Sequence, residues 1–156
     1  ELPVVGVNWN DADAYCRHYG KRLPTEQEWE KAARGTDGRE YPWGNEEPSS
    51  RYANYGKDYS ENFYNDRLTP VGNYEAGASP YGIQDLAGNV WELTSSEYAF
   101  SSKASKVLGF SSSKVIRGGS WNSEASFLRS ATQNLYVLSP RIISTYGFRC
   151  VQDVSR

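Results

Sequence analysis

The fold is decided by the stretch that opens with Arg117-Gly118-Gly119-Ser120-Trp121 and closes with Gly147-Phe148-Arg149-Cys150. Between these signatures, residues 122–146 mix Ser, Thr, aliphatic and aromatic residues with little charge. The runs Leu135-Tyr136-Val137-Leu138 and Ile142-Ile143-Ser144-Thr145-Tyr146 have no helical period, and a proline separates them. Apolar residues in such an irregular segment are either buried or held out for contact. Which of the two applies bears directly on function.

Composition bounds the class of protein. The chain has 156 residues, enough for one domain with a real core. Its net charge is −2, from 17 Lys and Arg against 19 Asp and Glu, and no basic stripe is present, which argues against a nucleic-acid partner. No apolar run reaches membrane-spanning length, so direct membrane insertion is not expected. Residues 1–5 do not resemble a signal peptide, and the sequence leaves open whether a signal peptide has been removed.

Two helices are predicted near the start of the chain. The first spans about residues 11–19, with Asn10 as its N-cap. The second spans about residues 26–34 and begins at the capping box Thr25-Glu26-Gln27-Glu28. A glycine follows each helix, as expected of a helix stop.

The rest of the chain reads as short strands and long loops. Residues 36–81 are rich in Gly, Pro, Asn, Asp and Tyr, and a loop region this long indicates function or bound ions that pin it. The Ser-rich residues 101–113 are expected to form an exposed loop. Strand-like stretches fall at about 69–72, 90–95, 114–117 and 146–152.

Several blocks occur in a fixed order along the chain. They are Val5-Gly6-Val7-Asn8-Trp9, Gly20-Lys21-Arg22-Leu23-Pro24-Thr25-Glu26, Tyr41-Pro42-Trp43-Gly44-Asn45, Tyr81-Gly82-Ile83-Gln84-Asp85-Leu86-Ala87-Gly88-Asn89-Val90-Trp91-Glu92, and the two signatures quoted first. Together they resemble the formylglycine-generating-enzyme (sulfatase-modifying factor) domain. The resemblance implies one α+β domain over residues 1–156, of C-type-lectin-like fold, with two helices, short antiparallel strands and long irregular loops. Family domains usually begin with further strands, which we expect to be absent or to lie in a separate segment.

Two cysteines, Cys16 and Cys150, lie near opposite ends of the chain. Their spacing alone leaves open whether they pair or are free buried thiols. The family resemblance implies a disulfide that ties the first helix to the last strand. A disulfide in turn implies an extracellular or cell-surface protein.

The resemblance also tells against catalysis. Enzymes of the family bind copper through two cysteines after the Gly-Gly-Ser-aromatic motif, and those places hold Ser123 and Leu128 here. Neither residue supplies a thiolate to Cu(I). A related branch binds iron through several histidines, but this chain has only His18. We therefore expect no enzymatic activity and neither copper nor iron.

Calcium is the ion that the resemblance does suggest. Asp85, Gly88, Val90 and Glu92 occupy places similar to a family Ca²⁺ site, and Asn54 resembles part of a second site. Carboxylate and carbonyl oxygens on an irregular turn suit this ion. The alternative is that Asp85 and Glu92 accept backbone N–H bonds and hold the turn without a metal.

Residues 121–146 resemble a narrower group, the variable proteins of diversity-generating retroelements. In these proteins a C-type-lectin-like domain ends in a stretch whose codons are mutated at adenines, between fixed framework residues. The residues here that resemble this fixed framework are Gly118-Gly119-Ser120-Trp121-Asn122, Arg129-Ser130-Ala131, Pro140 and Gly147-Phe148-Arg149. The residues here that resemble diversified positions are Ser123, Ser126, Phe127, Thr132, Leu135, Tyr136, Val137, Ile142, Ile143, Ser144 and Thr145. A degenerate paralogue of the enzyme would show a similar drifted segment.

The sequence thus favours a non-enzymatic binding domain whose target is a protein or other cell-surface molecule. Phe127, Leu135, Tyr136, Ile142 and Tyr146 would form an exposed aromatic and aliphatic patch, with Tyr146 the one best placed to pack inward. The alternatives are a formylglycine-generating-enzyme-like oxidase, its inactive paralogue, and a calcium-dependent carbohydrate-binding lectin. The lectin alternative lacks the sugar-binding motif of such proteins.

Overall fold

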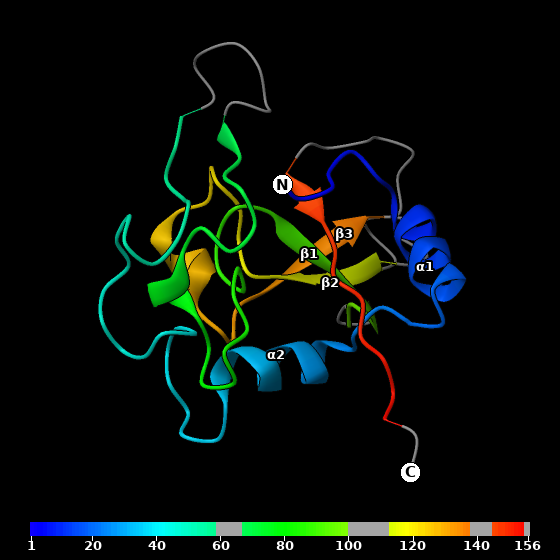
Figure 1. Ribbon diagram of the computed structural model, residues 1–156, viewed down its shortest axis with the longest axis horizontal. Coiled ribbons are helices and arrows are strands. Elements are labelled where there is room, and N and C mark those ends of the chain that lie inside the picture. Colours follow the sequence, from blue (N-terminus) through cyan, green and yellow to red (C-terminus); the bar gives the residue numbers. More distant parts are fainter. Residues whose placement is uncertain (59–66, 100–112, 138–144, 155–156) are drawn as a thin grey trace.

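The computed structural model describes residues 1–58, 67–99, 113–137 and 145–154. Two helices, a small sheet and long loops make up the described chain (Figure 1), which confirms the expected α+β class. The elements are, in order, α1 (Trp9–His18), α2 (Glu26–Arg34), η2 (Glu75–Gly77), β1 (Trp91–Glu97), β2 (Ser113–Arg117), η3 (Ala125–Leu128), β3 (Gln133–Val137) and β4 (Tyr146–Gly147).

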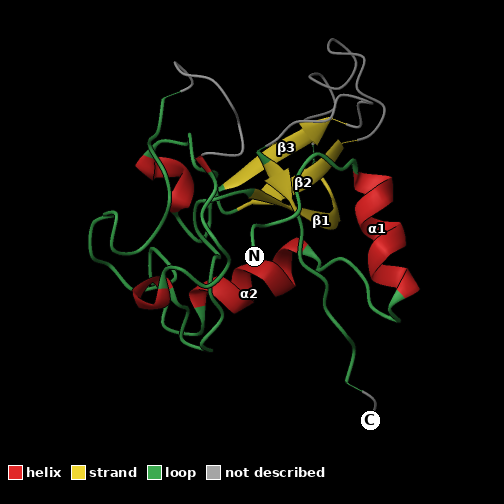
Figure 2. Cartoon of the chain, turned by 45° about the horizontal axis from the view of Figure 1, so that its top comes forward, coloured by secondary structure: helices red, strands yellow, loops and turns green. Residues whose placement is uncertain are grey.

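The strands form a four-stranded sheet in the order β3-β2-β1-β4. β1 and β3 both pair with β2 in antiparallel fashion, whereas β4 pairs with β1 in parallel. The sheet is therefore mixed, although the family resemblance implied antiparallel strands. In Figure 2 the sheet stands above α2, with α1 to one side and most of the loops to the other. The sheet therefore joins the helical side of the molecule to the loop side.

Two strand predictions need correction, and one strand was missed. Residues 69–72 form a turn, in which Asn73 N donates to the carbonyl of Pro70, because proline removes a donor and Gly72 adopts a φ of 79°. The last strand ends at Gly147, and beyond it Val151 makes an isolated bridge with Arg22. β3 was not predicted at all. Of the Ser-rich residues 101–113, which were expected to form an exposed loop, residues 101–112 lie outside the described chain and Ser113 is buried at the start of β2.

The helices follow their predicted capping signals with one exception. α2 begins at Thr25, whose side chain accepts from Glu28 N while the Glu28 carboxylate accepts from Thr25 N, as the capping box predicts. α1 begins earlier than expected. Asn8, not Asn10, is its N-cap, because Asn8 and Asp11 form a capping box of their own.

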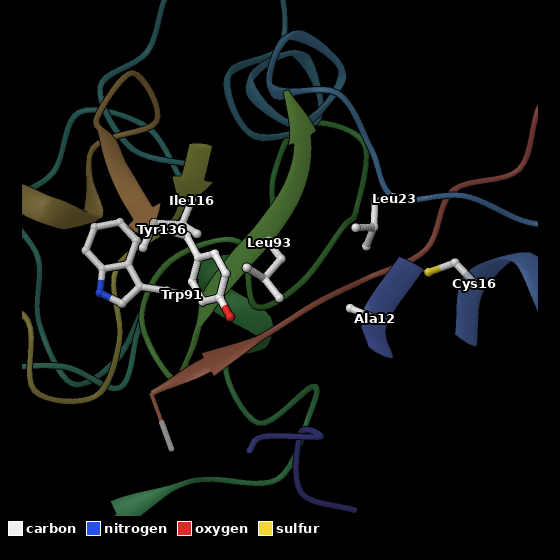
Figure 3. Close-up of a cluster of buried hydrophobic side chains, with 7 residues drawn as sticks. All are labelled: Ala12, Cys16, Leu23, Trp91, Leu93, Ile116 and Tyr136. Atoms are coloured by element: carbon white, nitrogen blue, oxygen red, sulfur yellow. The ribbon is translucent and has the colours of Figure 1, made fainter. Parts of the chain in front are cut away.

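The core lies where α1 meets the sheet. Figure 3 shows the cluster, in which side chains from α1, β1, β2 and β3 converge. Its fully or almost fully buried members are Ala12, Cys16, Leu23, Trp91, Leu93, Ile116 and Tyr136. At about 25 cal/mol per Å² of buried apolar surface, such a cluster supplies much of the stability of a small domain.

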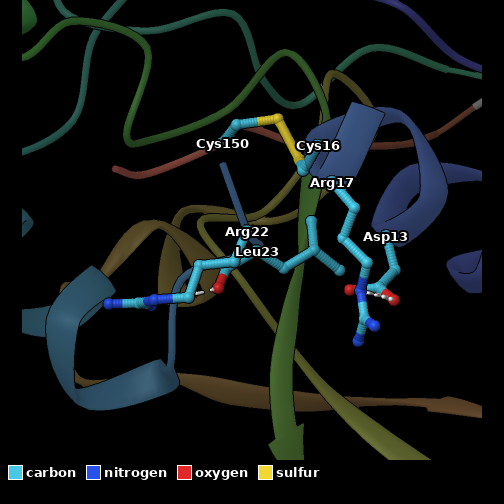
Figure 4. The surroundings of a disulfide bond; sticks show 6 residues. All are labelled: Asp13, Cys16, Arg17, Arg22, Leu23 and Cys150. Carbon is cyan, nitrogen blue, oxygen red and sulfur yellow. Dashed lines mark hydrogen bonds and ion pairs between the residues drawn. A yellow bond between two sulfur atoms is a disulfide. The ribbon is translucent and has the colours of Figure 1, made fainter. Parts of the chain in front are cut away.

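The two cysteines are joined. Cys16 on α1 and Cys150 form a disulfide, with Cα atoms 5.5 Å apart, and no free cysteine remains in the chain (Figure 4). The backbone beside it is held by the pair Arg22 and Val151, each of which donates its N–H to the other's carbonyl. This confirms the pairing that the family resemblance implied, and it fixes the end of the chain against α1.

Candidate functional site

The segment after β2 is held by a buried arginine. The side chain of Arg117 is fully buried, and its Nη1 donates to the carbonyls of Ser130, at 3.2 Å, and Thr132, at 2.8 Å. Its Nη2 lies 2.5 Å from Oε2 of Glu30, and its guanidinium stacks 5.5 Å from the ring centre of Trp29. Arg117 therefore ties the path of residues 130–132 to helix α2.

The Gly-Gly-Ser-Trp turn is compact because its glycines leave no room for a side chain. Gly118 has a φ of 93° and Gly119 a φ of 77°. A Cβ atom on Gly119 would lie 3.0 Å from Cδ2 of Leu128, and one on Gly118 would lie 3.1 Å from the carbonyl oxygen of Leu86. Trp121, which follows, is 1% exposed. The start of the segment is thus built into the core.

The two places expected from the resemblance to hold cysteines in the family's enzymes are occupied by buried side chains. Ser123 is buried, and its Oγ accepts from Ser120 N at 2.9 Å and lies 3.1 Å from Ser120 Oγ. Leu128 is fully buried in a second cluster with Tyr41, Ala53 and Ala87. Neither residue has an exposed, ionisable atom with which to bind copper or attack a substrate.

The predicted binding residues divide by exposure. Ser126 is exposed, while Thr132 and Leu135 are half-buried, and Oγ1 of Thr132 donates to the Ser126 carbonyl at 3.1 Å. Phe127 is also half-buried and meets the ring of Trp91 edge-on at 5.6 Å. Ile142, Ile143 and Ser144 lie outside the described residues, as does the side chain of Val137.

Three of the predicted binding residues point inward, and the expectation that they are displayed is wrong. Tyr136 is 2% exposed, and its ring meets that of Tyr146 edge-on at 5.4 Å. Burial raises the pKa of the Tyr136 phenol above its ordinary value. Thr145 and Ser123 are buried as well. The physical reason is the same for all three, since each lies beside a sheet strand or a tight turn whose inner face is the core.

A different set of side chains faces outward from this segment. From residue 128 to 133, buried or half-buried residues alternate with exposed ones, which is the pattern of a segment with one face on the core. We call the exposed set the 124–133 face, which consists of Glu124, Ser126, Arg129, Ala131 and Gln133. Of this face only Ser126 was predicted to be variable, whereas Arg129 and Ala131 were expected among the fixed framework residues. The signal that could have found the others is the alternation of buried and exposed positions. It was overlooked because Ala131 and Gln133 are not residue types that by themselves indicate binding.

The 124–133 face adjoins the loop of residues 40–52. Arg129 forms an ion pair with Glu40 and lies over the ring of Tyr41 at 6.0 Å, and Ser130 N donates to the Glu40 carbonyl at 2.8 Å. Tyr41 stacks on Trp43 with ring centres 5.0 Å apart. An aromatic stack of this kind resists deformation, so the face rests on a rigid base.

The far end of the segment is held by a second arginine. Arg149 donates from Nε to Oε2 of Glu92 at 2.7 Å and from Nη2 to Oε1 at 2.5 Å. Nη2 also lies 3.1 Å from the carbonyl of Gln84 and 3.2 Å from that of Asp85. Burial alone lowers the pKa of Arg149, but the negative charge of Glu92 outweighs it and the pKa is raised. Arg149 therefore stays charged and paired.

These contacts bear on the expected calcium site. Glu92 is 4% exposed, and both its oxygens are engaged by Arg149, with Trp29 Nε1 a further donor to Oε2 at 2.6 Å. Oδ2 of Asp85 accepts from Gly72 N at 2.6 Å. The guanidinium of Arg149 thus occupies the side of the Glu92 carboxylate that a metal ion would need. This arrangement does not fit a calcium ion bound to Glu92.

The remaining residues of the two expected calcium sites lie close together. The carbonyl of Gly88 accepts from Val90 N at 2.8 Å, and the backbones of Asn54 and Gly88 form an isolated parallel bridge. The Asn54 amide donates to the Arg67 carbonyl and to Oδ1 of Asn89. No group of three or more His, Cys, Asp or Glu suited to a metal occurs among the described residues. The calcium role of Asp85, Gly88, Val90 and Asn54 stays a prediction, while the carboxylate of Glu92 is engaged by Arg149 and Trp29 instead.

No helix in the described part of the chain is long and apolar enough to cross a membrane. His18 is exposed at the end of α1.

Comparison with known proteins gives relatives of several kinds. Inactive C-alpha-formylglycine-generating enzyme 2 of Bos taurus is 39% identical over 166 residues, which cover 100% of this chain and 52% of the relative. Hercynine oxygenase of Mycobacterium tuberculosis is 40% identical over 145 residues, covering 85% of this chain and 32% of the enzyme. The chain therefore spans about half the length of these relatives or less.

The fold is shared with solved structures that include Treponema denticola variable protein 1. That structure superposes with a TM-score of 0.76 at 22% identity, over 96% of this chain and 70% of the other. The model of the sulfatase-modifying factor enzyme 1-like domain matches residues 1–154. The ordered blocks, the fold and this match agree, and the chain belongs to the sulfatase-modifying factor enzyme 1-like domain family.

Proposed function

We propose that this chain is a non-enzymatic binding domain whose ligand surface is centred on the 124–133 face. One observation carries the proposal: exposed side chains alternate with anchored ones along residues 128–133. Arg117 and Leu128 hold the backbone from inside, while Arg129, Ala131 and Gln133 face solvent. On such a frame the outward side chains can change without loss of the fold, which is what a variable recognition surface requires.

The chemistry of the enzyme positions supports the absence of catalysis. Ser123 is engaged in a tight turn and Leu128 is buried in the core, so neither place offers a thiolate. The disulfide leaves no free thiol elsewhere. His18 is exposed on a helix, away from these places in the chain. The similarity of the full length of this chain to inactive C-alpha-formylglycine-generating enzyme 2 supports this proposal.

We infer a protein or other cell-surface molecule as the target. The 124–133 face carries one cation, one carboxylate, the polar side chains of Ser126 and Gln133, and an alanine, which suits a mixed protein surface better than a polyanion. The disulfide accords with an oxidising, extracellular or cell-surface location. On their residue types alone, Val137, Ile142, Ile143 and Ser144 stay within the proposed ligand surface.

The decisive test is the DNA that flanks the gene. We expect a near-identical copy of the 122–146 segment, rich in Asn codons, beside a reverse-transcriptase gene. Differences from that copy should fall at adenines and should concentrate in the codons of the outward residues. Differences spread equally over the codons of Trp121, Leu128 and Ser130 would indicate drift and would contradict the proposal.

A second test addresses the enzymatic alternative. The protein is purified under copper- and iron-replete conditions, its metal content is measured, and it is incubated with a sulfatase-derived cysteine peptide. We expect neither bound metal nor formation of formylglycine. Stoichiometric copper together with peptide oxidation would overturn the non-enzymatic proposal.

A further inference from the structure

Arg129 is the one cation of the 124–133 face, and its side chain is 54% exposed. It follows directly on η3, which Figure 1 shows in gold on the side of the sheet away from α1. Two other members of the face, Ser126 and Ala131, are small and uncharged. A molecule that settles on the middle of this face therefore meets a guanidinium.

Two contacts hold this guanidinium in place before any ligand arrives. Nη1 forms an ion pair with Oε1 of Glu40, and the guanidinium carbon lies 6.0 Å from the ring centre of Tyr41. Tyr41 is buried and stacks on Trp43, with the two ring planes 2° from parallel. Because the side chain is already restricted, a ligand that binds Arg129 pays less conformational entropy than it would on a free arginine.

The other edge of the guanidinium is the one with which arginines of this protein bind carboxylates. Within residues 1–58, 67–99, 113–137 and 145–154, no acceptor receives a hydrogen bond from Nε or Nη2 of Arg129. In Arg39 these two nitrogens both bind the Asp37 carboxylate, at 3.0 and 2.6 Å. In Arg149 they both bind that of Glu92. Arg129 thus presents an open, two-donor edge of the shape that fits a carboxylate.

A first carboxylate does not prevent an arginine of this protein from binding a second one. Arg22 donates from Nη1 and Nη2 to Glu28, at 2.7 and 2.6 Å, and from Nε and Nη2 to Asp153, at 3.2 and 2.6 Å. Arg129 and Glu40 reproduce the first half of this arrangement. The half that Arg129 lacks is a second carboxylate, which a ligand can supply.

We propose that the 124–133 face recognises an Asp or Glu side chain of its protein target, which Nε and Nη2 of Arg129 bind in a two-bonded ion pair. This inference rests on the proposed function, because it names the group that the face recognises. Ser126 and Gln133 add neutral hydrogen-bonding groups to the same face. A charge-assisted, two-bonded pair is stronger than a neutral hydrogen bond and fixes orientation, so Arg129 determines which targets are accepted.

The test begins with a displayed library of short random peptides, selected against the immobilised protein. We expect Asp and Glu to be enriched among the binders. General attraction would give the opposite result, because the net charge of the chain is −2 and favours basic peptides. The tightest binder is then synthesised together with a copy in which each carboxylate is an amide. Fluorescence anisotropy should show at least about tenfold weaker binding of the amide copy.

Variants of the protein separate recognition from a structural role of Arg129. Arg129→Ala should weaken binding of the acidic peptide by at least about tenfold, and Arg129→Lys, which keeps the charge but lacks the two-donor edge, by about fivefold. The amide copy should bind Arg129→Ala and the parent protein equally, since the lost contact is the carboxylate pair. A merely structural role of Arg129 would weaken binding of both peptides by the same factor.

Arg51→Ala is the matched control. Arg51 is exposed and also lies over an aromatic ring, that of Tyr52 at 5.6 Å, but it is not part of the 124–133 face. This variant should bind the acidic peptide like the parent protein. Circular dichroism melting confirms that each variant is folded.

The variant Ala131→Trp distinguishes a failure of this inference from a failure of the proposed function, because it places a bulky side chain on the face. Binders without enriched Asp or Glu that Ala131→Trp blocks would overturn the carboxylate inference and leave the ligand surface standing. Equal losses of both peptides in Arg129→Ala, or equal effects of Arg51→Ala and Arg129→Ala, would also overturn the inference alone. A library without binders, or binders insensitive to Ala131→Trp, would count against both.

Discussion

Arg149 and Glu92 form a two-bonded ion pair in which both carboxylate oxygens face the guanidinium, at 2.7 Å from Nε and 2.5 Å from Nη2. Glu92 lies on β1, and Trp29 of α2 donates to the same carboxylate at 2.6 Å. One buried acid thus connects the end of the proposed ligand-binding segment, the sheet and a helix. In the function that we propose, the side chains of the 124–133 face rest on a backbone that Arg117 holds before it and Arg149 holds after it.

We expect Glu92→Gln to lower the free energy of unfolding by about 3 kcal/mol, because it leaves the partly buried charge of Arg149 without its partner. Urea unfolding followed by tryptophan fluorescence measures the change. Glu97→Gln is the matched control, since Glu97 pairs with Lys114 but its side chain is 65% exposed, and it should cost less than about 1 kcal/mol. Equal losses in both variants would refute the anchoring role of Glu92.

The burial of Tyr136 gives the sharpest distinction between anchored and displayed residues. Tyr136→Ala should destabilise the protein by about 3–5 kcal/mol, since it empties a site in the main core. Ser126→Ala, on the exposed face of the same segment, should change the free energy of unfolding by no more than about 0.5 kcal/mol. If Tyr136→Ala melted like the parent protein, the side chain would be displayed after all.

Local signals in the sequence were enough to place the helices. The capping box at Thr25 predicted the start of α2 correctly because it is a contact between residues three apart. The N-cap of α1 was misplaced by two residues because Asn8 and Asn10 are chemically equal candidates, and only the partner Asp11 decides between them. The disulfide followed from the family resemblance and not from the spacing of the cysteines.

Contacts between distant residues could not be predicted from the pattern. β3 was missed because Leu135 and Tyr136 lack a clear period, and its pairing with β2 is what makes it a strand. The direction of the Tyr136 side chain follows from that pairing. Likewise, nothing local shows that Arg149 would take the carboxylate of Glu92, 57 residues earlier in the chain. Side-chain direction within the binding segment was therefore the weakest part of the site prediction.

Acid should weaken the start of α2. Arg22 holds the pKa of Glu28 down to about 2, from 4.5, chiefly through side-chain hydrogen bonds, with a further bond from Thr25 N. Because the folded pKa is lower than the unfolded one, the stabilisation is complete above pH 4.5 and is lost as the pH falls towards about 2.

Both side chains of this pair are more than a third exposed, so we expect a loss of no more than about 1 kcal/mol. Thermal melts between pH 6 and pH 2 measure it. Glu28→Gln should lower the melting temperature at neutral pH and flatten its decline in acid. A decline as steep in Glu28→Gln as in the parent would assign the acid sensitivity to other carboxyl groups.

Removal of the disulfide should be costly, because it joins residues 134 positions apart. We expect the double variant Cys16→Ala, Cys150→Ala to lose about 2–5 kcal/mol of stability, measured by urea unfolding. The parent protein treated with a reductant should approach the same value. A parent protein that is insensitive to reductant and equal in stability to the double variant would show that the cysteines are not paired in solution.

Calcium offers the clearest test of the role of Glu92. A resident ion would stabilise the fold by about 2.7 kcal/mol at a hundredfold excess over its Kd. Because Arg149 and Trp29 already engage both oxygens of Glu92, we expect the melting temperature in calcium chloride to equal that in EDTA. A saturable increase with calcium, absent in Asp85→Asn, would show that the ion displaces the guanidinium and that the site expected from the sequence forms.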